Sequence, residues 1–294
     1  MAHEMMCPAC GCKESGYVYE KLKMPGSLCR CVKCGLCFMR PDPLYNGREQ
    51  VYDKHYYDQW SLDDLGFEGL SRMKQATFEH LFDMIAAYKQ EGTLLDIGCA
   101  FGDLLIVAAK RGWTGYGVEL SVYAATEAKK KIPPDRIWTG DFISSYLPRK
   151  KFNVITMIDV IEHTCNTPAV LKKCYDMLEP NGLLAIVTPD FDSLSRKIMG
   201  KGWPHFKMEH LIYFSRRSIV RSLTMSKFEI LKVLNFRKAL NLYYVMAQFS
   251  SAEKASFLKY PAKLAGILLP DFVKKKNFFM LNGEMLVLAG KKAE

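Results

Sequence analysis

Cysteine residues are concentrated near the start of the chain. Seven of the ten cysteines lie between residues 7 and 37. Within this group Cys7 and Cys10 form one C-x2-C pair, and Cys31 and Cys34 form a second, with 20 residues between the pairs. Two such pairs supply four thiolates, the ligand set that Zn²⁺ prefers in tetrahedral structural sites. We therefore predict a zinc-binding module over residues 1–45, with these four cysteines as ligands.

Further cysteines leave the ligand set open. Cys37 forms another C-x2-C pair with Cys34, and Cys12 or Cys29 could also replace one of the four. A glycine follows each main pair, as expected where a knuckle turns through a positive φ. Disulfides are the alternative use of these residues, and a reducing compartment disfavours them. A bound ion would allow this short segment to fold without a large core of its own.

A glycine-rich turn follows an apolar run in the middle of the chain. Residues 93–97 have the pattern of a buried strand, and Gly98 and Gly102 precede a predicted helix over residues 103–111. A second apolar run, residues 116–119, ends in a carboxylate. Strand, glycine-rich turn, helix and strand with a terminal acidic residue are typical of a nucleotide-binding unit. Its glycines allow a ligand to approach the backbone closely.

The turn has the form D-x-G-x-A-x-G between Asp96 and Gly102. It resembles motif I of the class I S-adenosylmethionine-dependent methyltransferases, with Ala100 in place of the middle glycine. The run D-V-I-E-H that begins at Asp159 resembles the segment after the fourth strand in that family. The resemblance covers about residues 70–290. It implies an enzyme that uses S-adenosylmethionine (SAM) as its methyl donor.

The resemblance also implies which residues bind the cofactor. Glu119 would accept hydrogen bonds from the ribose hydroxyls, and Asp141 and Phe142 would meet the adenine. The full expected set is Asp96, Gly98, Cys99, Ala100, Gly102, Glu119, Leu120, Asp141, Phe142, Asp159 and Val160.

Alternating apolar runs and helical segments predict an α/β protein with a Rossmann-like, doubly wound sheet. Residues 71–294 form the expected methyltransferase domain, and residues 46–70 form a tyrosine-rich linker from the zinc module. Apolar residues at helical spacing over residues 71–88 predict a helix that faces the core. A turn over residues 178–182 precedes the fifth strand. The seven predicted strands are 93–97, 116–119, 136–139, 152–158, 183–188, 228–235 and 284–289.

The zinc module joined to this domain narrows the group of methyltransferases that the chain resembles. The whole is similar to the ubiquinone-methylase-like class (type 23) and to zinc-binding sugar C-methyltransferases. The segment from Glu209 to Ser215, E-H-x-x-Y-F-S, resembles a segment of the latter. This implies that His210 is a general base, with Glu209 orienting the acceptor. A histidine suits that role because its ordinary pKa is about 6.5. The alternative for His210 is a structural hydrogen bond.

Further residues are candidates for contact with the acceptor. Tyr56 and Tyr57 lie in the predicted linker, and His163 and Tyr213 lie in the two motifs that follow strands. For the linker tyrosines the alternative is aromatic packing between modules. For His163 the alternative is that it shapes the cofactor pocket.

Charge is distributed unevenly over the 294 residues, whose formal net charge is +10. Residues 196–294 hold 19 Lys and Arg against 6 Asp and Glu, whereas the remainder holds 22 against 25. A basic region indicates an anionic partner or simply a solvated face. The stretch 239–281 mixes apolar residues and lysines, which suits a lid over the acceptor or a contact with an anionic membrane or a lipid-linked substrate.

No apolar run of 18 residues and no signal-like start occur in the sequence, so we expect a cytoplasmic protein. A peripheral contact with the inner face of the membrane stays open. The predicted reaction is methyl transfer to a small molecule, most of all a saccharide, sugar nucleotide or related secondary metabolite. The alternatives are an RNA or protein methyltransferase and a non-catalytic SAM-binding scaffold. Nucleic acid is disfavoured because residues 188–191, T-P-D-F, lack the amide of an N-P-P-Y motif.

Overall fold

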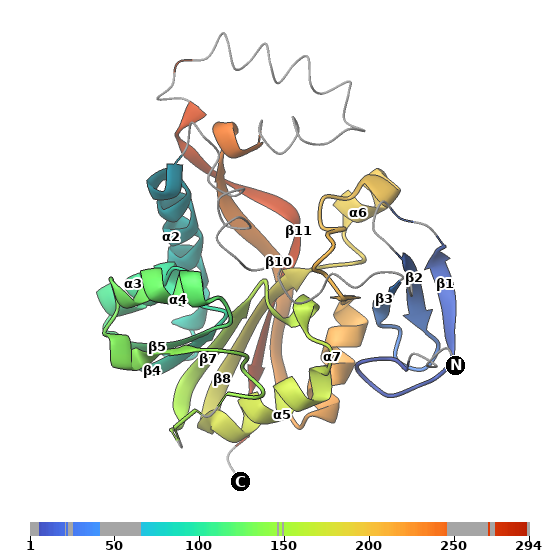
Figure 1. Cartoon of the computed structure of the whole chain (residues 1–294), viewed down its shortest axis with the longest axis horizontal. Helices are drawn as coiled ribbons and strands as arrows, with labels where there is room; N and C mark the ends of the chain where they lie inside the picture. The colour runs from blue at the N-terminus through green and yellow to red at the C-terminus, as the bar shows by residue number, and fades with distance from the viewer. Residues whose placement is uncertain are drawn as a thin grey trace.

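Two β-sheets organise the computed structural model of the chain (Figure 1). The structure describes residues 6–20, 22, 26–41, 66–145, 147–148, 150–245, 270 and 274–292. The strands of the larger sheet are β4 (Gly92–Ile97), β5 (Trp113–Glu119), β6 (Ile137–Thr139), β7 (Phe152–Ile158), β8 (Leu178–Pro189), β10 (Glu229–Asn241) and β11 (Asn277–Gly290). The smaller sheet contains β1 (Ser15–Tyr19), β2 (Gly26–Cys31), β3 (Cys37–Pro41) and β9 (Ile212–Tyr213).

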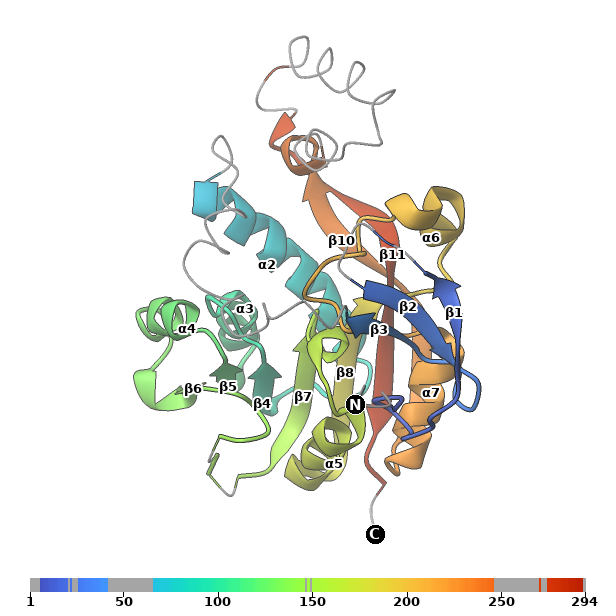
Figure 2. The ribbon, with the colours of Figure 1, turned by 45° about the vertical axis from the view of Figure 1, so that its right-hand side comes forward.

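The larger sheet confirms the predicted fold class. Within the described residues it has seven strands in the order β10-β11-β8-β7-β4-β5-β6. Strands β4 to β8 are mutually parallel, and β11 is antiparallel to both β8 and β10. Helices cover both of its faces, as Figure 2 shows. The described helices are α2 (Gly66–Ile85), α3 (Asp103–Lys110), α4 (Val122–Lys129), α5 (Thr167–Met177), α6 (Leu194–Met199) and α7 (Arg216–Met225), with short 3-10 turns at Pro134–Arg136, Ile161–His163 and Gly200–Gly202.

The β10–β11 hairpin differs most from the expectation. Both strands extend well beyond the predicted bounds 228–235 and 284–289, because they continue to pair with each other past the end of β8. The first and last residues of the predicted insertion 239–281 therefore belong to these strands. Residues 246–269 and 271–273 of that insertion lie outside the described part of the chain.

The predicted turn over residues 178–182 is part of β8. Phe152 of β7 pairs with Leu178, and the next pair joins Val154 to Leu183, so the intervening residues bulge out of the ladder. Asn181 adopts a φ of 59° within that bulge. The chain therefore does turn locally at these residues, as the sequence predicts, but β8 pairs with β7 both before and after the turn.

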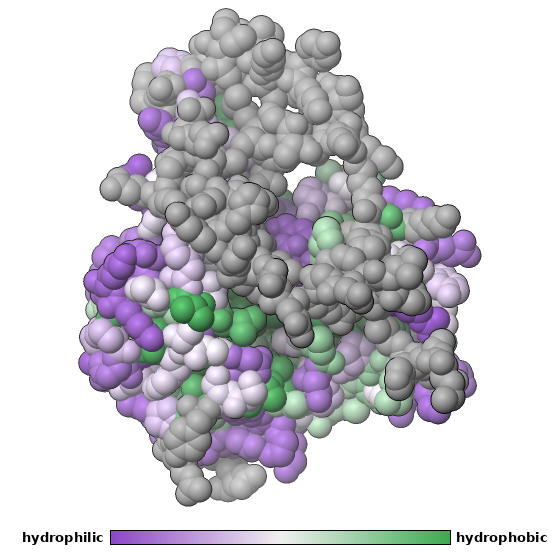
Figure 3. All heavy atoms as spheres, in the orientation of Figure 1, coloured by the Kyte–Doolittle hydropathy of each residue, from purple (hydrophilic) through white to green (hydrophobic). Residues whose placement is uncertain are grey.

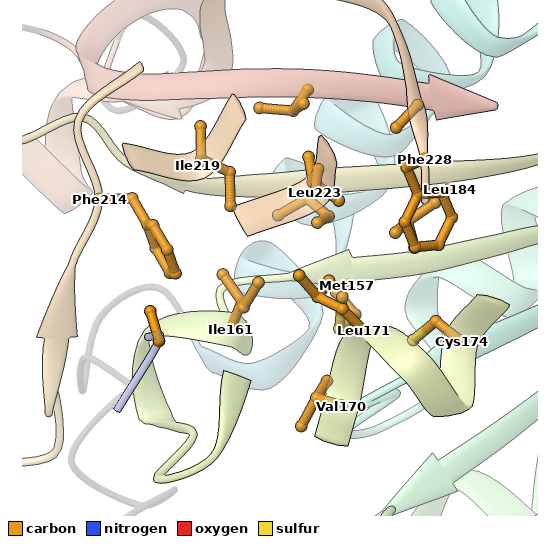
Figure 4. Close-up of a cluster of buried hydrophobic side chains, with 14 of the residues drawn as sticks. Met157, Ile161, Val170, Leu171, Cys174, Leu184, Phe214, Ile219, Leu223 and Phe228 are labelled. Carbon is orange, nitrogen blue, oxygen red and sulfur yellow. The ribbon is translucent and has the colours of Figure 1, made fainter. Parts of the chain in front are cut away.

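The core lies on both faces of the sheet. On one face, side chains of β7 and β8 meet α5 and α7, as in the close-up of Met157, Leu171, Leu184 and Leu223 (Figure 4). On the other face, Leu81, Phe82 and Ile85 of α2 pack with α3 and with the strands. The helical stripe predicted over residues 71–88 thus faces the core.

The N-terminal module shares this core. Cys7, Cys31 and Phe38 belong to the same buried cluster as Met157 and Leu171. Strand β3 also pairs with β9, a two-residue strand from the segment that follows α6. The module is therefore attached to the larger domain both by side-chain packing and by a strand pair.

On the face shown in Figure 3, hydrophilic side chains gather over α3 and α4 at the left edge, with hydrophobic residues closer to the middle. None of the helices that the structure describes has the length and apolar character needed to cross a bilayer.

Candidate cofactor, acceptor and metal sites

The glycine-rich turn connects β4 to α3, and three alternate residues in it have positive φ: Gly98 at 75°, Ala100 at 45° and Gly102 at 79°. A Cβ at Gly98 would lie 2.5 Å from Cγ2 of Val160, so this glycine is needed for packing as well as for its φ. Ala100 bears a Cβ in the left-handed region, which costs about 1–2 kcal/mol. The turn is therefore a strained backbone element at the carboxyl end of the first parallel strand.

Glu119 fixes the shape of this turn. Its Oε2 accepts a hydrogen bond from the Ala100 amide at 2.8 Å, and its Oε1 accepts one from the Ser121 amide at 2.8 Å. The carboxylate thereby stabilises the unusual Ala100 conformation and ties the end of β5 to the turn. The residue that follows, Leu120, is 53% exposed and so presents an apolar surface beside it.

The other expected cofactor residues differ in exposure. Asp96 and Cys99 are buried beneath the turn; Thr156 Oγ1 donates to Asp96 at 2.7 Å, and burial raises the pKa of Asp96 to about 7. Asp141 is exposed, and its Oδ1 accepts from the amides of residues 143 and 144. The ring of Phe142 is buried in the core cluster beneath Lys173.

Next to the turn, residues of α2, α3 and α4 line a half-open pocket of about 200 Å³. Lys74 and Ser71 from α2 and Asp103 at the start of α3 line it. Ser71 Oγ donates to Asp103 at 2.5 Å, and burial lowers the pKa of the Lys74 ammonium. These polar groups escaped the sequence analysis because an interior polar position on α2 carries no motif.

A buried polar cluster lies at the carboxyl ends of β7 and β8 and joins residues that are far apart in sequence. It contains His163 and His210, whose ring centroids are 4.8 Å apart in an edge-on arrangement. The Nδ1 of His163 lies 2.9 Å from the carbonyl oxygen of Glu209, and Thr188 Oγ1 donates to Glu162 at 2.9 Å. The structure thus brings together three predicted residues and Glu162, which no prediction singled out although it lies within the D-V-I-E-H run.

Burial sets the protonation of this cluster. It lowers the pKa of His163, and it lowers the pKa of His210 well below the ordinary value, with the neighbouring His163 adding to the effect. Burial raises the pKa of Glu162 to about 8, and the charge of Asp159 adds to the rise. Both histidines are therefore neutral near pH 7, whereas Glu162 is largely protonated. Tyr213, on β9, lies 6.0 Å from His210 between ring centroids, and burial raises its pKa as well.

An ion-paired network adjoins the cluster on the β10–β11 side. Nζ of Lys238 lies 2.6 Å from Oδ2 of Asp159 and 2.8 Å from Oε1 of Glu284. Burial alone would lower the pKa of Lys238, but the two carboxylates outweigh it and raise that pKa. Burial likewise favours a raised pKa for Asp159, and Lys238 reverses the shift and lowers it. Neither Lys238 nor Glu284 was expected from the sequence.

Glu162, His163 and His210 could also hold a metal ion, because one possible ligand atom from each lies within 4.8 Å of the others. The two acceptor-site candidates of the linker, Tyr56 and Tyr57, lie outside the described residues.

Four thiols meet in the N-terminal module. The sulfurs of Cys7, Cys10, Cys31 and Cys34 all lie within 4.8 Å of one another. The Cys7–Cys34 and Cys10–Cys31 sulfur distances are 3.5 and 3.6 Å. The glycines that follow the two pairs, at positions 11 and 35, have φ of 67° and 77°, as the knuckle interpretation predicts. Three further cysteines, Cys12, Cys29 and Cys37, are outside this group.

Comparison with known proteins adds to this geometry. Residues 54–233 match a family described as a methyltransferase domain. The chain is 30% identical over 98 residues to the ubiquinone biosynthesis O-methyltransferase of Bradyrhizobium diazoefficiens, covering 32% of this chain and 39% of that protein. It is 31% identical over 107 residues to the protein of the same name from Histophilus somni, covering 33% and 45%. The matches thus span less than half the length of these relatives.

Solved structures show the same fold at low sequence identity. A SAM-dependent methyltransferase from Archaeoglobus fulgidus has a TM-score of 0.54 at 18% identity, covering 80% of this chain and all of that one (100%). Magnesium protoporphyrin IX methyltransferase from Synechocystis, with bound SAH, has a TM-score of 0.53 at 15% identity, covering 82% and 97%.

The raised pKa of Glu162 predicts how stability depends on pH. The folded protein binds this proton more tightly than the unfolded chain, so the stabilisation is complete below pH 4.5 and is lost as pH rises through about 8. Glu162→Gln has no such proton to lose. We expect its melting temperature, relative to the unsubstituted protein, to be higher at pH 8.5 than at pH 5 by at least about 2–4 °C, the change that corresponds to about 1 kcal/mol for a domain of this size.

Thermal unfolding without added ligands measures this difference. The exposed Glu91→Gln is the matched control and should show no pH-dependent difference. An equal effect of both variants, or a Glu162→Gln effect that is larger at pH 5, would contradict the buried, protonated state of Glu162.

Proposed function

The chain belongs to the methyltransferase-domain family and has the fold of the class I SAM-dependent methyltransferases, and from this premise we propose that it transfers a methyl group from SAM to a hydroxyl-bearing small molecule. The favoured acceptor is a saccharide, a sugar nucleotide or a related metabolite, free or lipid-linked. The relatives named above are O-methyltransferases, which agrees with transfer to an oxygen.

The residues around the glycine-rich turn fit SAM. Glu119 is a carboxylate held at the carboxyl end of β5 by two backbone amides, and ligands of such sheets bind at the carboxyl ends of the strands. We assign it to the ribose hydroxyls. The exposed Leu120 offers an apolar contact, and Asp141 and Asp159 lie at the ends of β6 and β7. When bound, SAM supplies a methyl group that its sulfonium sulfur already activates.

The buried polar cluster is the main support for placing the acceptor at this end of the sheet. Of the seven buried side-chain N and O atoms that lack a hydrogen-bond partner among the described residues, five are in or beside this cluster. These five atoms are Glu162 Oε1, His210 Nδ1, Tyr213 OH, Asn282 Oδ1 and Glu284 Oε2. Each buried polar atom without a partner costs about 1–3 kcal/mol. Because the set contains acceptors as well as a hydroxyl, a ligand with several hydroxyl groups would satisfy it best.

His210 is the proposed proton acceptor. Its neutral ring is available to take a proton, and its Nδ1 has no partner among the residues that the structure describes. His163 packs edge-on against it and is itself held by the Glu209 carbonyl, so the position of the His210 ring is defined on one side. The protein's remaining task is to hold the acceptor in line with the methyl group, a proximity effect.

Transfer of label tests this function. The purified protein is incubated with methyl-labelled SAM and an extract of its source organism, and the products are separated into polar small-molecule, lipid, RNA and protein fractions. We expect label in the polar or lipid fraction. Glu119→Gln should weaken the binding of S-adenosylhomocysteine (SAH), the demethylated product, by about tenfold or more, which corresponds to about 1.4 kcal/mol.

Label in RNA or protein would instead favour a macromolecular acceptor, and no label with intact SAH binding would favour a non-catalytic scaffold. Glu91→Gln again serves as the matched control for SAH binding, because this residue is exposed and lies at the opposite end of β4 from the turn.

Substitution of His210 tests its role as a base. General acid–base catalysis contributes about 10²–10⁴-fold to a rate. His210→Gln should therefore lower kcat by about that factor and leave the SAH dissociation constant unchanged. His80→Gln is the control. The His80 ring, on α2, stacks on Phe236 of β10 and is not part of the cluster. If kcat falls by less than the control's effect, or SAH binding weakens in parallel, His210 has only a structural role.

We also propose that Cys7, Cys10, Cys31 and Cys34 bind one Zn²⁺. A tetrahedral site with Zn–S bonds of about 2.3 Å requires sulfurs about 3.8 Å apart. The sulfur distances of 3.5 and 3.6 Å in the structure are close to that value. Such an ion would contribute to folding and hold the two knuckles together. Its site is separate from the acceptor cluster, so it supplies no step of the transfer.

Metal analysis checks this ligand set. We expect about one zinc per chain by mass spectrometry, its loss in Cys34→Ser, and its retention in Cys12→Ser. Because β3 pairs with the segment that carries the acceptor cluster, chelation should also lower the melting temperature and the transfer rate together. Retention of zinc by Cys34→Ser, or its loss from Cys12→Ser, would assign the ion to a different set of cysteines.

A further inference from the structure

A β-bulge interrupts the β10–β11 hairpin beside the acceptor cluster. Phe236 of β10 pairs with Glu284, but the next residue of β10, Arg237, pairs with Leu281. Asn282 and Gly283 therefore have no counterparts on β10. Gly283 has a φ of 89°, and a Cβ there would lie 2.2 Å from Oγ of Ser195. Bulges of this kind re-aim side chains and are common beside active sites.

The bulge places Glu284 in an asymmetric environment. The residue is 3% exposed. Its Oε1 accepts from Nζ of Lys238 at 2.8 Å and from Nδ2 of Asn282 at 3.0 Å. Its Oε2 is buried and has no partner in the described part of the chain. One carboxylate oxygen thus accepts hydrogen bonds from two donors, while the other has no donor among the described residues.

Two neighbours of Glu284, Lys238 and His205, connect it to the proposed sites. Lys238 also pairs with Asp159 at 2.6 Å, at the carboxyl end of β7, where the cofactor is expected. His205, whose Nε2 lies 4.0 Å from Glu284 Oε1, is oriented by its contact with the Asn282 carbonyl oxygen at 3.1 Å. The backbone of His205 also hydrogen-bonds the His210 side chain. Glu284 is therefore linked to the cofactor side through Lys238 and to the acceptor cluster through His205.

We propose that Glu284 is an acceptor-binding residue whose Oε2 accepts a hydrogen bond from a hydroxyl group of the acceptor, with Lys238 and Asn282 as positioning residues. The proposal rests on the proposed function and identifies which group of this cluster selects for a hydroxyl. Burial raises the pKa of this carboxyl to about 7, so about half of it is ionised at neutral pH, and the ionised form accepts the hydrogen bond.

The charges around Glu284 favour a hydroxyl over an ammonium group. Lys238 already contacts the carboxylate at 2.8 Å, so a second cation on the same carboxylate would lie close to a like charge in a buried site. A hydroxyl donates its hydrogen without bringing a net charge. It could also accept from another member of the cluster, such as the Tyr213 hydroxyl.

A crystal structure of the SAH complex soaked in glycerol gives the direct test. Glycerol is the probe because it presents adjacent hydroxyls without charge. We expect a glycerol hydroxyl within hydrogen-bond distance of the Glu284 oxygen that Lys238 does not contact. The proposal would be overturned if a protein donor is paired with that oxygen. It would also be overturned if glycerol binds without a hydroxyl near that oxygen, or if neither glycerol nor water is found there.

Kinetics with the labelled acceptor fraction give the second test. Glu284→Gln keeps the shape of the side chain but replaces one oxygen by an amide donor. We expect the rate at limiting acceptor to fall by about tenfold or more, with a smaller fall at saturating acceptor, because a hydrogen bond to a charged group is lost. The SAH dissociation constant should stay within about twofold of the original value, since Glu284 does not contact the cofactor side directly.

Asn282→Ala should also lower the rate at limiting acceptor more than the rate at saturating acceptor, but by a smaller factor than Glu284→Gln. Glu229→Gln, an exposed glutamate at the start of β10, is the matched control. An equal fall at limiting and saturating acceptor, or weaker SAH binding, would assign Glu284 a structural role only. If the unsubstituted protein transfers no label at all, the proposed function fails, and the glycerol complex still decides whether Glu284 binds a hydroxyl.

Discussion

The structure depends on a short backbone ladder that runs from β3 to the acceptor cluster. Cys37 and Phe38 of β3 pair with Tyr213 and Ile212, and the Met39 amide donates to the Leu211 carbonyl at 2.8 Å. On the other side, the Leu211 amide donates to the Glu162 carbonyl at 2.9 Å. The segment that carries His210 is therefore held between the N-terminal module and the end of β7. Without the module, one side of this segment would lose its hydrogen-bond partners, so the cysteine-rich region is part of the frame of the proposed acceptor site.

The charges inside the cluster are arranged for binding at the expense of stability. Burial raises the pKa of the Glu162 carboxyl to about 8 and that of Glu284 to about 7, and within the described part of the chain each has an oxygen without a partner. Apolar residues of similar size would avoid that cost. Natural proteins break such packing rules chiefly at functional sites. The concentration of these costs at one end of the sheet is therefore itself an argument for a ligand there.

Local sequence patterns were sufficient to predict the parts that depend on local structure. The turn from Asp96 to Gly102, the carboxylate at Glu119 and the four clustered cysteines all follow from spacing along the chain, and the fold class follows from the alternation of strands and helices. Lys238 and Glu284 could not be predicted in this way, because their meeting depends on the register of β10 against β11 and on a bulge two residues long. The lengths of these two strands were missed for the same reason, since their outer halves are stabilised by each other.

The direction of β11 explains why the two halves of the site meet. Parallel strands bring their carboxyl ends to one edge, which collects Glu119, Asp141 and Asp159 on the cofactor side. Strand β11 runs in the opposite direction, so the residue that pairs with Pro189, the last residue of β8, is Glu284 in its interior. The preceding residues of β11 extend past that edge with β10. An antiparallel strand next to β8 therefore places a carboxylate, and through it Lys238, at the edge where the parallel strands end. The Asp159–Lys238–Glu284 ion pairs are the consequence, and they join the cofactor side to the acceptor side without a loop between them.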